Sequence, residues 1–183
     1  MKLITLFKFM FAFGLMQACG GKPEWIAYSN TKGDFVTTIA EEGDIIWYGT
    51  KKGLVKFERT EGKRTQLTES NSGLSDNDVK AITMDKKHVK WISTSLGLST
   101  FDGTNWDSFD ISNSRIPANL VSAVAIDASD TKWIGTNKGL AKFDGTNWTV
   151  FTTSNSPLPN DRVTAVTVGK NDNIWIGTEG DGI

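Results

Sequence analysis

Few side chains in this sequence could do acid–base or nucleophilic chemistry, and those few fall in predicted turns. His88 is the only histidine and ends the segment Asp85-Lys86-Lys87-His88, while Asp130 holds the equivalent place 42 residues later. A general base must hold its imidazole within hydrogen-bond reach of a substrate proton. A solvated turn does not provide that, so we interpret His88 as a surface residue.

Carboxylates are more numerous and could act in pairs as acid and base. Most of them stand where aspartate caps backbone N–H groups in turns, and we favour that structural role. The candidates are Asp76 with Asp78, Asp127 with Asp130, and the separate residues Asp161, Asp172, Glu179 and Asp181.

Motifs for a metal, a phosphate or a redox cofactor are missing from the sequence. Cys19 is the only cysteine, which excludes an internal disulfide and a cysteine-based zinc site. The segment Asn171-Asp172-Asn173 lacks the glycine and the distal glutamate of a calcium loop, and no Gly-x-Gly-x-x-Gly or Walker sequence occurs. We predict that the chain is not an enzyme and takes no cofactor.

Charge gives no reason to expect nucleic acid as a partner. The 183 residues carry a net charge of −1, and the cationic clusters are as short as Lys51-Lys52 and Lys86-Lys87. Binding to phosphate backbones needs clustered lysine and arginine. We therefore predict no nucleic-acid partner.

Residues 1–18 have the composition of an export signal. Lys2 precedes an apolar run, from Leu3 to Met16, that is too short for a membrane span of about 20 apolar residues. The phrase Leu15-Met16-Gln17-Ala18-Cys19 resembles the lipobox of bacterial lipoproteins, from which Met16 and Gln17 depart. We predict a lipid on Cys19, a tether over residues 19–24 and attachment to the cell envelope, on the periplasmic side or at the outer membrane. A plain signal peptide is the alternative.

The remaining chain is built from copies of one pattern. Tryptophans recur at Trp47, Trp91, Trp133 and Trp175, each inside a phrase of the Trp-Ile-Gly-Thr type. A valine stands eleven or twelve residues before each of them, and the first three are followed by Gly-Leu and then phenylalanine. Trp106 and Trp148 form a second set, with Trp25 as an isolated earlier copy. A fixed period of 42 to 44 residues is typical of repeat architectures.

Each copy contains four short strand patterns separated by turn residues. In the third copy we predict strands over 121–126, 132–136, 140–143 and 148–151, with Asp144-Gly145-Thr146-Asn147 as a hairpin turn. Four antiparallel strands in about 42 residues is the size of a propeller blade. We predict an all-β fold over residues 25–183, a β-propeller of four-stranded blades with about three and a half blades present. Either the strand at Trp25 closes a small ring, or further blades follow.

These phrases resemble a known family, the two-component regulator propeller repeat. The resemblance rests on Trp-Ile-Gly-Thr, Gly-Leu-x-x-Phe-Asp-Gly, Asn-Trp-x-x-Phe and Asn-Ser-x-Leu-Pro, with Arg64, Ser75 and Ser93 as departures. It implies an extracytoplasmic sensor that binds a glycan-type ligand such as an oligosaccharide, with a kinase beyond Ile183 or on a partner. Two alternatives stay open: a cell-envelope scaffold that binds protein partners, as in type IX secretion, and a histidine-dependent propeller lyase.

The connections differ from copy to copy, whereas the strands are alike. Binding surfaces of repeat proteins vary while their core stays constant. On a propeller, the connection between blades shares a face with the turn between the second and third strands of a blade. We predict ligand or partner contacts on that face from Lys52, Arg115, Asn119, Asn137, Lys138, Asp161 and Arg162.

Overall fold

The computed structural model describes residues 14–19, 22–27 and 35–180, which fall into an N-terminal unit up to Gly33 and a main unit from Asp34 onward. In the first, strands β1 (Gly14–Cys19) and β2 (Lys22–Ala27) pair antiparallel. The predicted tether overlaps both strands, and residues 20–21 lie outside the described residues. Lipidation of Cys19 stays a prediction.

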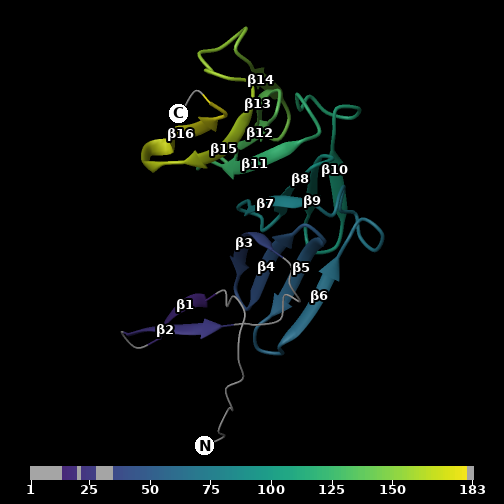
Figure 1. Cartoon of the computed structure of the whole chain (residues 1–183), viewed down its shortest axis with the longest axis vertical. Helices are drawn as coiled ribbons and strands as arrows, with labels where there is room; N and C mark the ends of the chain where they lie inside the picture. The colour runs from purple at the N-terminus through teal and green to yellow at the C-terminus, as the bar shows by residue number, and fades with distance from the viewer. Residues whose placement is uncertain (1–13, 20–21, 28–34, 181–183) are drawn as a thin grey trace, which may run out of the picture. The chain divides into compact units, whose positions relative to one another are not determined.

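The main unit contains three four-stranded antiparallel sheets and two strands of a fourth, in chain order (Figure 1). Sheet one is β3 (Val36–Glu42), β4 (Ile45–Thr50), β5 (Gly53–Glu58) and β6 (Lys63–Leu67). Sheet two is β7 (Val79–Met84), β8 (Lys90–Thr94), β9 (Leu98–Phe101) and β10 (Trp106–Phe109). Sheet three is β11 (Val121–Ile126), β12 (Lys132–Thr136), β13 (Gly139–Phe143) and β14 (Trp148–Phe151). The fourth has β15 (Val163–Val168) and β16 (Ile174–Thr178). The predicted strands of the third copy are confirmed, with β13 beginning one residue earlier.

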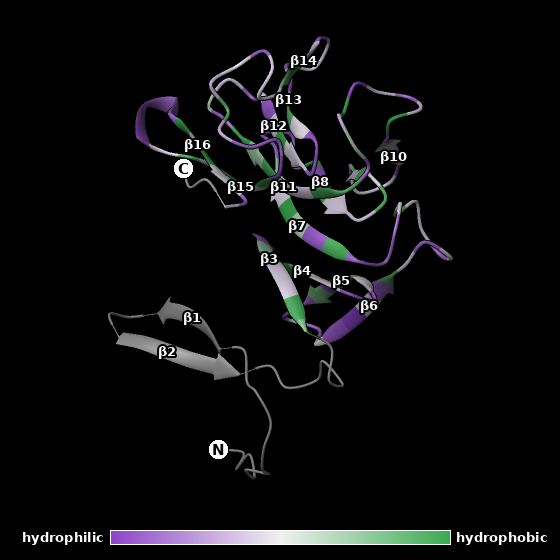
Figure 2. Ribbon diagram, turned by 45° about the horizontal axis from the view of Figure 1, so that its top comes forward, coloured by the Kyte–Doolittle hydropathy of each residue, from purple (hydrophilic) through white to green (hydrophobic). Residues whose placement is uncertain are grey.

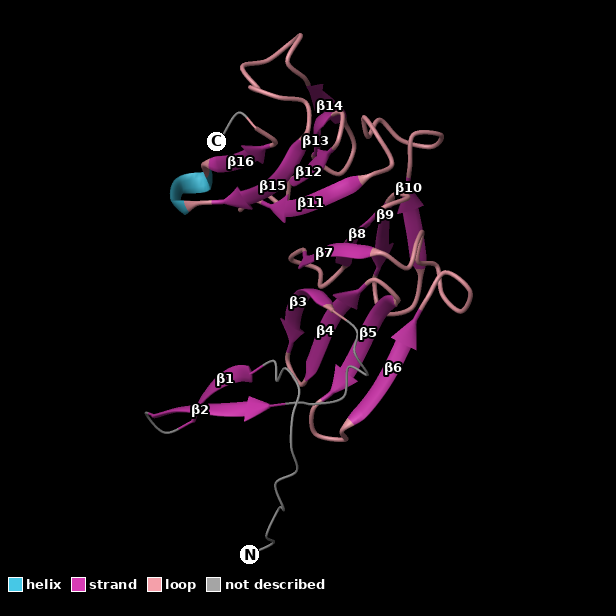
Figure 3. Cartoon of the chain, in the orientation of Figure 1, coloured by secondary structure: helices cyan, strands magenta, loops and turns pink. Residues whose placement is uncertain are grey.

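The only helix among the described residues is η1 (Lys170–Asp172), a single 3-10 turn between β15 and β16 (Figure 3). No helix in this part of the chain is long and apolar enough to cross a membrane.

The sheets stack through their first strands. Strand β3 contacts β7, β7 contacts β11, and β11 contacts β15. The valines that begin β7, β11 and β15, namely Val79, Val121 and Val163, are all fully buried. The outermost strand behaves oppositely: β6 is exposed along most of its length and hydrophilic, whereas β11 is largely hydrophobic (Figure 2). This stacking of consecutive four-stranded antiparallel sheets is that of propeller blades and confirms the predicted fold class.

A β-bulge lies near the start of each first strand, and in blades one and three its side chain bonds to the next blade. The register shifts between Val36 and Thr38 and at the matching places of the other three blades. The bulge residue Thr37 donates its hydroxyl to the carbonyl of Val79 in the next blade at 2.6 Å. Ser122 does the same toward Val163 at 2.5 Å. A bulge turns one side chain away from the pleat, and here it serves as a link between blades.

The Gly-Thr of the tryptophan phrase has two separate packing roles. A Cβ on Gly49 would lie 2.4 Å from a methyl group of Val79, so glycine permits the next blade to approach. The buried Thr50 hydroxyl donates to the carbonyl of Gly53 and accepts from the N–H of Lys52, which closes the turn between β4 and β5. The same threonine turn recurs in blades two and three.

Candidate functional site

In blades one to three, the tryptophan of the second strand is held by an acidic residue of its own blade. The indole N–H donates to Glu42 from Trp47 at 2.7 Å, to Asp85 from Trp91 at 3.1 Å, and to Asp127 from Trp133 at 3.0 Å. The two aspartates also accept backbone N–H bonds within their hairpin turns. Asp127 and Asp130, which sequence reasoning weighed as an acid–base pair, thus have structural partners: Asp127 accepts from Trp133, and Asp130 accepts from Lys132 at 2.8 Å.

A buried lysine of the following blade completes the first two of these clusters. Lys90 is only 4% exposed, and its ammonium lies 2.6 Å from the Glu42 carboxylate and 5.2 Å from the centre of the Trp47 ring. Lys132, 5% exposed, lies 3.7 Å from the Asp85 carboxylate and 5.1 Å from the Trp91 ring. Sequence reasoning missed both lysines, and the signal for them was a lysine directly before the tryptophan in copies two and three.

Electrostatics within these clusters keep the acids ionised. Burial by itself raises the pKa of Glu42, but hydrogen bonds from Lys90 and Trp47 outweigh it, so the pKa lies below its ordinary value. Burial likewise raises the pKa of Asp127, and donors from Trp133, Thr131 and Ser129 reverse the effect. Carboxylates with a lowered pKa stay ionised and do not act as general acids near neutral pH.

The fourth blade departs from this pattern. Gly169 stands where Asp85 and Asp127 stand, and Ile174 replaces the buried lysine. A Cβ on Gly169 would lie 2.8 Å from the indole nitrogen of Trp175, which is 55% exposed. The interface between blades three and four is therefore apolar where the two preceding interfaces are ionic.

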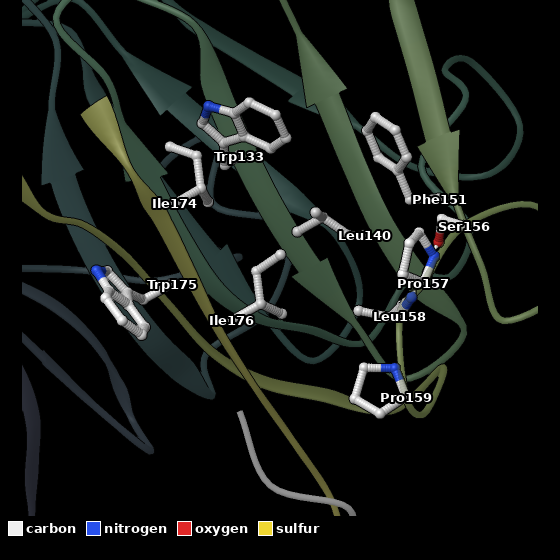
Figure 4. Close-up of a pocket in the computed structure, with 10 residues that line it drawn as sticks. All are labelled: Trp133, Leu140, Phe151, Ser156, Pro157, Leu158, Pro159, Ile174, Trp175 and Ile176. Atoms are coloured by element: carbon white, nitrogen blue, oxygen red, sulfur yellow. Dashed lines mark hydrogen bonds between the residues drawn. The ribbon is translucent and has the colours of Figure 1, made fainter. Parts of the chain in front are cut away.

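An apolar groove of about 630 Å³ lies at that interface, between β12–β14 and β16 (Figure 4). Ile174 and Ile176 point toward the face formed by Trp133 and Leu140, while Trp175 points away (Figure 4). At the two preceding interfaces, third-strand phenylalanines of the following blade pack on this face. Phe101 lies 6.0 Å from Trp47 and Phe143 lies 6.2 Å from Trp91. Among the described residues, the fourth blade contributes only β15 and β16 to its interface.

The predicted contact residues divide into three groups. Lys52, Asn137 and Lys138 lie in the turns between second and third strands, as expected. The N–H of Asn137 donates to the carbonyl of Leu120, which places the end of the β10–β11 connection beside this turn. The side-chain oxygen of Asn137 is buried and accepts no hydrogen bond from any described residue. The turn at Asn137 therefore lies beside a connection between blades, and ligand contact by this group stays a prediction.

The second group is Asn119 and Asp161, and each of these side chains bonds across the connection between two blades. Asn119 accepts the N–H of Ile111 at 2.9 Å, and Asp161 accepts that of Thr153 at 2.7 Å. Asn77 plays the same part for Glu69 at 3.1 Å. These side chains hold the loop between blades in all three copies, so their role is structural. The sequence comparison did not reveal this role because the residue is Asn in two copies and Asp in the third.

Arg162 and Arg115 have different surroundings. Arg162 pairs with Glu179 at 2.5 Å on an exposed edge. Arg115 is exposed and lines a separate polar cavity of about 530 Å³ that also includes Trp148 and Asn147. The seven residues are thus not gathered into a single site.

The histidine that sequence reasoning weighed as a general base lies in an exposed turn. His88 has φ +61° in the β7–β8 turn, Asp130 has φ +66° in the β11–β12 turn, and the His88 side chain is 74% exposed. Within the described chain, no three His, Cys, Asp or Glu side chains are grouped to hold a metal ion. What the arrangement offers is a rigid frame with two cavities and variable connections.

Residues 157–180 match the family model described as two component regulator propeller. The predicted resemblance to this repeat is therefore confirmed, and the matched segment is the fourth copy of the pattern. None of the curated proteins matches the sequence.

The solved structures with the same fold include three proteins of different kinds. One is the extracellular domain of the hybrid two component system BT3049 from B. thetaiotaomicron, with 24% identity, a TM-score of 0.70, and coverage of 82% of this chain and 23% of that one. Another is PorZ, a surface component of the type-IX secretion system of Porphyromonas gingivalis, with 20% identity, a TM-score of 0.58, and coverage of 79% and 23%. The third is virginiamycin B lyase from Staphylococcus aureus, with 15% identity, a TM-score of 0.60, and coverage of 86% and 53%. The chain thus spans about a quarter of the first two proteins.

Proposed function

We propose that this chain is the ligand-binding propeller of an extracytoplasmic sensor, attached to the cell envelope through a lipid on Cys19, and that its ligand is a glycan-type molecule. The observation that carries the proposal is the fold shared with the extracellular domain of a hybrid two component system, over 82% of this chain. The export signal and the lipobox-like phrase favour the same compartment.

The geometry favours binding over catalysis. Acidic residues near the tryptophans are tied to indole N–H groups, and the histidine lies in an exposed turn. Two cavities in a rigid frame, one apolar and one polar, are suited to hold a ligand by shape and by a few polar groups. We infer that the chain itself carries out no reaction, and that a kinase or another signalling part responds to ligand binding.

The alternative is an envelope scaffold, favoured by the likeness to PorZ over 79% of this chain. A scaffold would recognise a protein or a lipopolysaccharide surface. The fold is also that of lyases, but their chemistry requires an active-site histidine, and His88 is placed in an exposed turn.

A thermal-shift screen of the full chain distinguishes the two functions. A panel of neutral and acidic oligosaccharides is compared with purified lipopolysaccharide and with buffer. The sensor proposal predicts that at least one soluble oligosaccharide raises the melting temperature in a saturable manner, because a ligand that binds the folded state stabilises it. Stabilisation by lipopolysaccharide alone favours the scaffold, and no shift with any soluble saccharide contradicts the glycan ligand.

A further inference from the structure

The polar cavity between blades two and three is formed by two loops. One wall is the start of the β10–β11 connection, with Asn113 and Arg115, and the other is the β13–β14 turn, with Asn147 leading into Trp148. Its volume of about 530 Å³ is large enough for a small organic ligand.

A comparison between copies explains why a cavity exists here. Gly73 is the repeat equivalent of Arg115, and Trp106 is the equivalent of Trp148. A Cβ on Gly73 would lie only 2.2 Å from the Cβ of Trp106, so the first of these loops lies directly against its tryptophan. Arginine has a Cβ and a long side chain, so the second loop must stand away from Trp148. Arginine in place of glycine at this repeat position therefore both opens the cavity and places a guanidinium beside it.

The walls are fixed before any ligand arrives. Asn113 accepts the N–H of Asp110 at 2.8 Å and donates to the carbonyl of Ser108 at 2.9 Å. Asn147 donates its backbone N–H to Asp144 at 2.7 Å. The Trp148 ring stacks on Phe143 with centroids 4.4 Å apart. A site whose side chains are already ordered loses little conformational entropy on binding.

Arg115 and Trp148 are the two side chains in the cavity best suited to hold a ligand. Arg115 forms no hydrogen bond or ion pair with any residue that the structure describes. The half-buried Trp148 lines the cavity, and its ring is fixed by stacking on Phe143 and by Phe109, whose ring centroid is 5.7 Å away. Guanidinium binds carboxylate through paired hydrogen bonds, and an indole packs against an apolar ring face. The rest of the lining is amide and hydroxyl, which suits a ligand rich in hydroxyl groups.

We propose that this cavity binds an acidic saccharide, with the carboxylate of a uronic-acid unit on Arg115 and the sugar ring against Trp148. The proposal rests on the function proposed above and deepens it, because it names the ligand class and the site. The carboxylates of Asp110 and Asp144 are each held by local donors that lower their pKa, mainly the Ser112 hydroxyl for Asp110 and backbone N–H groups for Asp144. These two carboxylates are therefore bonded within their own loops and do not pair with Arg115, whose guanidinium can bind the ligand.

Isothermal titration of the full chain with trigalacturonic acid tests the proposal, and galactotriose is the neutral counterpart. Arg115→Gln removes the charge at similar length, and Trp148→Phe keeps an aromatic ring on Phe143. The matched controls are Lys87→Gln, an exposed cation in the β7–β8 turn and outside the cavity, and Trp106→Phe, the repeat equivalent. Circular dichroism verifies that each variant is folded, and Arg115→Gln alters only an exposed side chain.

We expect the acidic trisaccharide to bind and the neutral one to bind at least about tenfold more weakly, because a hydrogen bond to a charged group contributes that much. Arg115→Gln should weaken binding by the same factor, Trp148→Phe should weaken it severalfold, and the controls should leave it unchanged. Equal affinity of the wild-type chain and Arg115→Gln, or binding of only the neutral sugar, overturns the site while the glycan-binding function stands. Failure of both sugars and of the wider oligosaccharide panel overturns both.

Discussion

The ionic cluster between blades one and two allows a quantitative test of what holds the blades together. Lys90 is almost fully buried against Trp47, and its single carboxylate partner is Glu42 at 2.6 Å. Glu42→Gln keeps the size of the side chain and an acceptor for the indole N–H. It leaves a buried ammonium without its counter-charge, which typically costs about 3–5 kcal/mol. Because glutamine still offers a carbonyl oxygen to Lys90, we expect about 3 kcal/mol, at the lower end.

The partner substitution should behave differently. Lys90→Met removes the buried cation and leaves a carboxylate that is hydrogen-bonded to Trp47 and partly exposed. We expect a cost of about 1 kcal/mol, and about the same or less for the double variant, because apolar replacement of a buried pair is often neutral. The fourth blade carries Ile174 at the lysine position, which shows that an apolar residue fits the repeat there.

Equilibrium unfolding in urea, followed by tryptophan fluorescence, measures the cycle. Urea is preferred because guanidinium would screen the charges under test. The two single costs should exceed the cost of the double variant by about 2 kcal/mol or more, with unchanged dependence on denaturant. A Glu42→Gln cost below about 1 kcal/mol, or strictly additive substitutions, would refute the view that this pair is coupled and buried.

Three further outcomes follow from the structure. The pKa values of Glu42 and Asp127 are lowered in the folded chain, so their contribution to stability is full above their ordinary values of 4.5 and 3.8 and is lost as pH falls through the folded values. Urea midpoints should therefore be flat above about pH 5 and fall below it, and less so in Glu42→Gln; an unchanged midpoint at acid pH contradicts this. Cys19→Ala should remove the lipid mass and move the chain out of the membrane fraction, as intact mass and fractionation will show, whereas equal membrane association of both forms argues for a plain signal peptide. Gly49→Ala should cost about 1–3 kcal/mol in urea unfolding, because its Cβ would lie 2.4 Å from a valine methyl of β7, and Gly177→Ala, whose nearest contact is 3.4 Å, should be nearly neutral. Equal effects of these two alanines would contradict the packing described.

Much of the fold could be predicted because each blade requires particular residue types at fixed positions, and these recur as a sequence pattern. The phrase around Trp133 sets the second strand, and the predicted strands of that copy match β11–β14 within one residue. Glycine before threonine marks the place where the next blade approaches, as at Gly49. Such requirements act within one copy and recur in the next, so a sequence pattern carries them.

The contacts between copies could not be predicted in the same way. Lys90 and Lys132 are charged residues at strand starts, where lysine is ordinarily exposed. Lys90 pairs with Glu42 of the preceding blade, and Lys132 pairs with Asp130 of its own blade at 2.8 Å and lies 3.7 Å from Asp85 of the preceding blade. The structural role of Asn119 and Asp161 was hidden because two residue types provide the same acceptor oxygen. Arg115 was selected as a variable loop residue, but its proximity to Trp148 depends on how far the loop stands from the turn, which no spacing encodes.

The central claim is that a constant propeller frame presents variable connections to a saccharide. Its most direct test is hydrogen–deuterium exchange of the full chain, measured with and without a pooled mixture of acidic and neutral oligosaccharides. We predict that the saccharides slow exchange in the connections around residues 110–120 and 144–148, while the equivalent segments 68–78 and 102–106 and the buried strands stay unchanged. Equal protection in both copies, or no change in any connection, would contradict the claim.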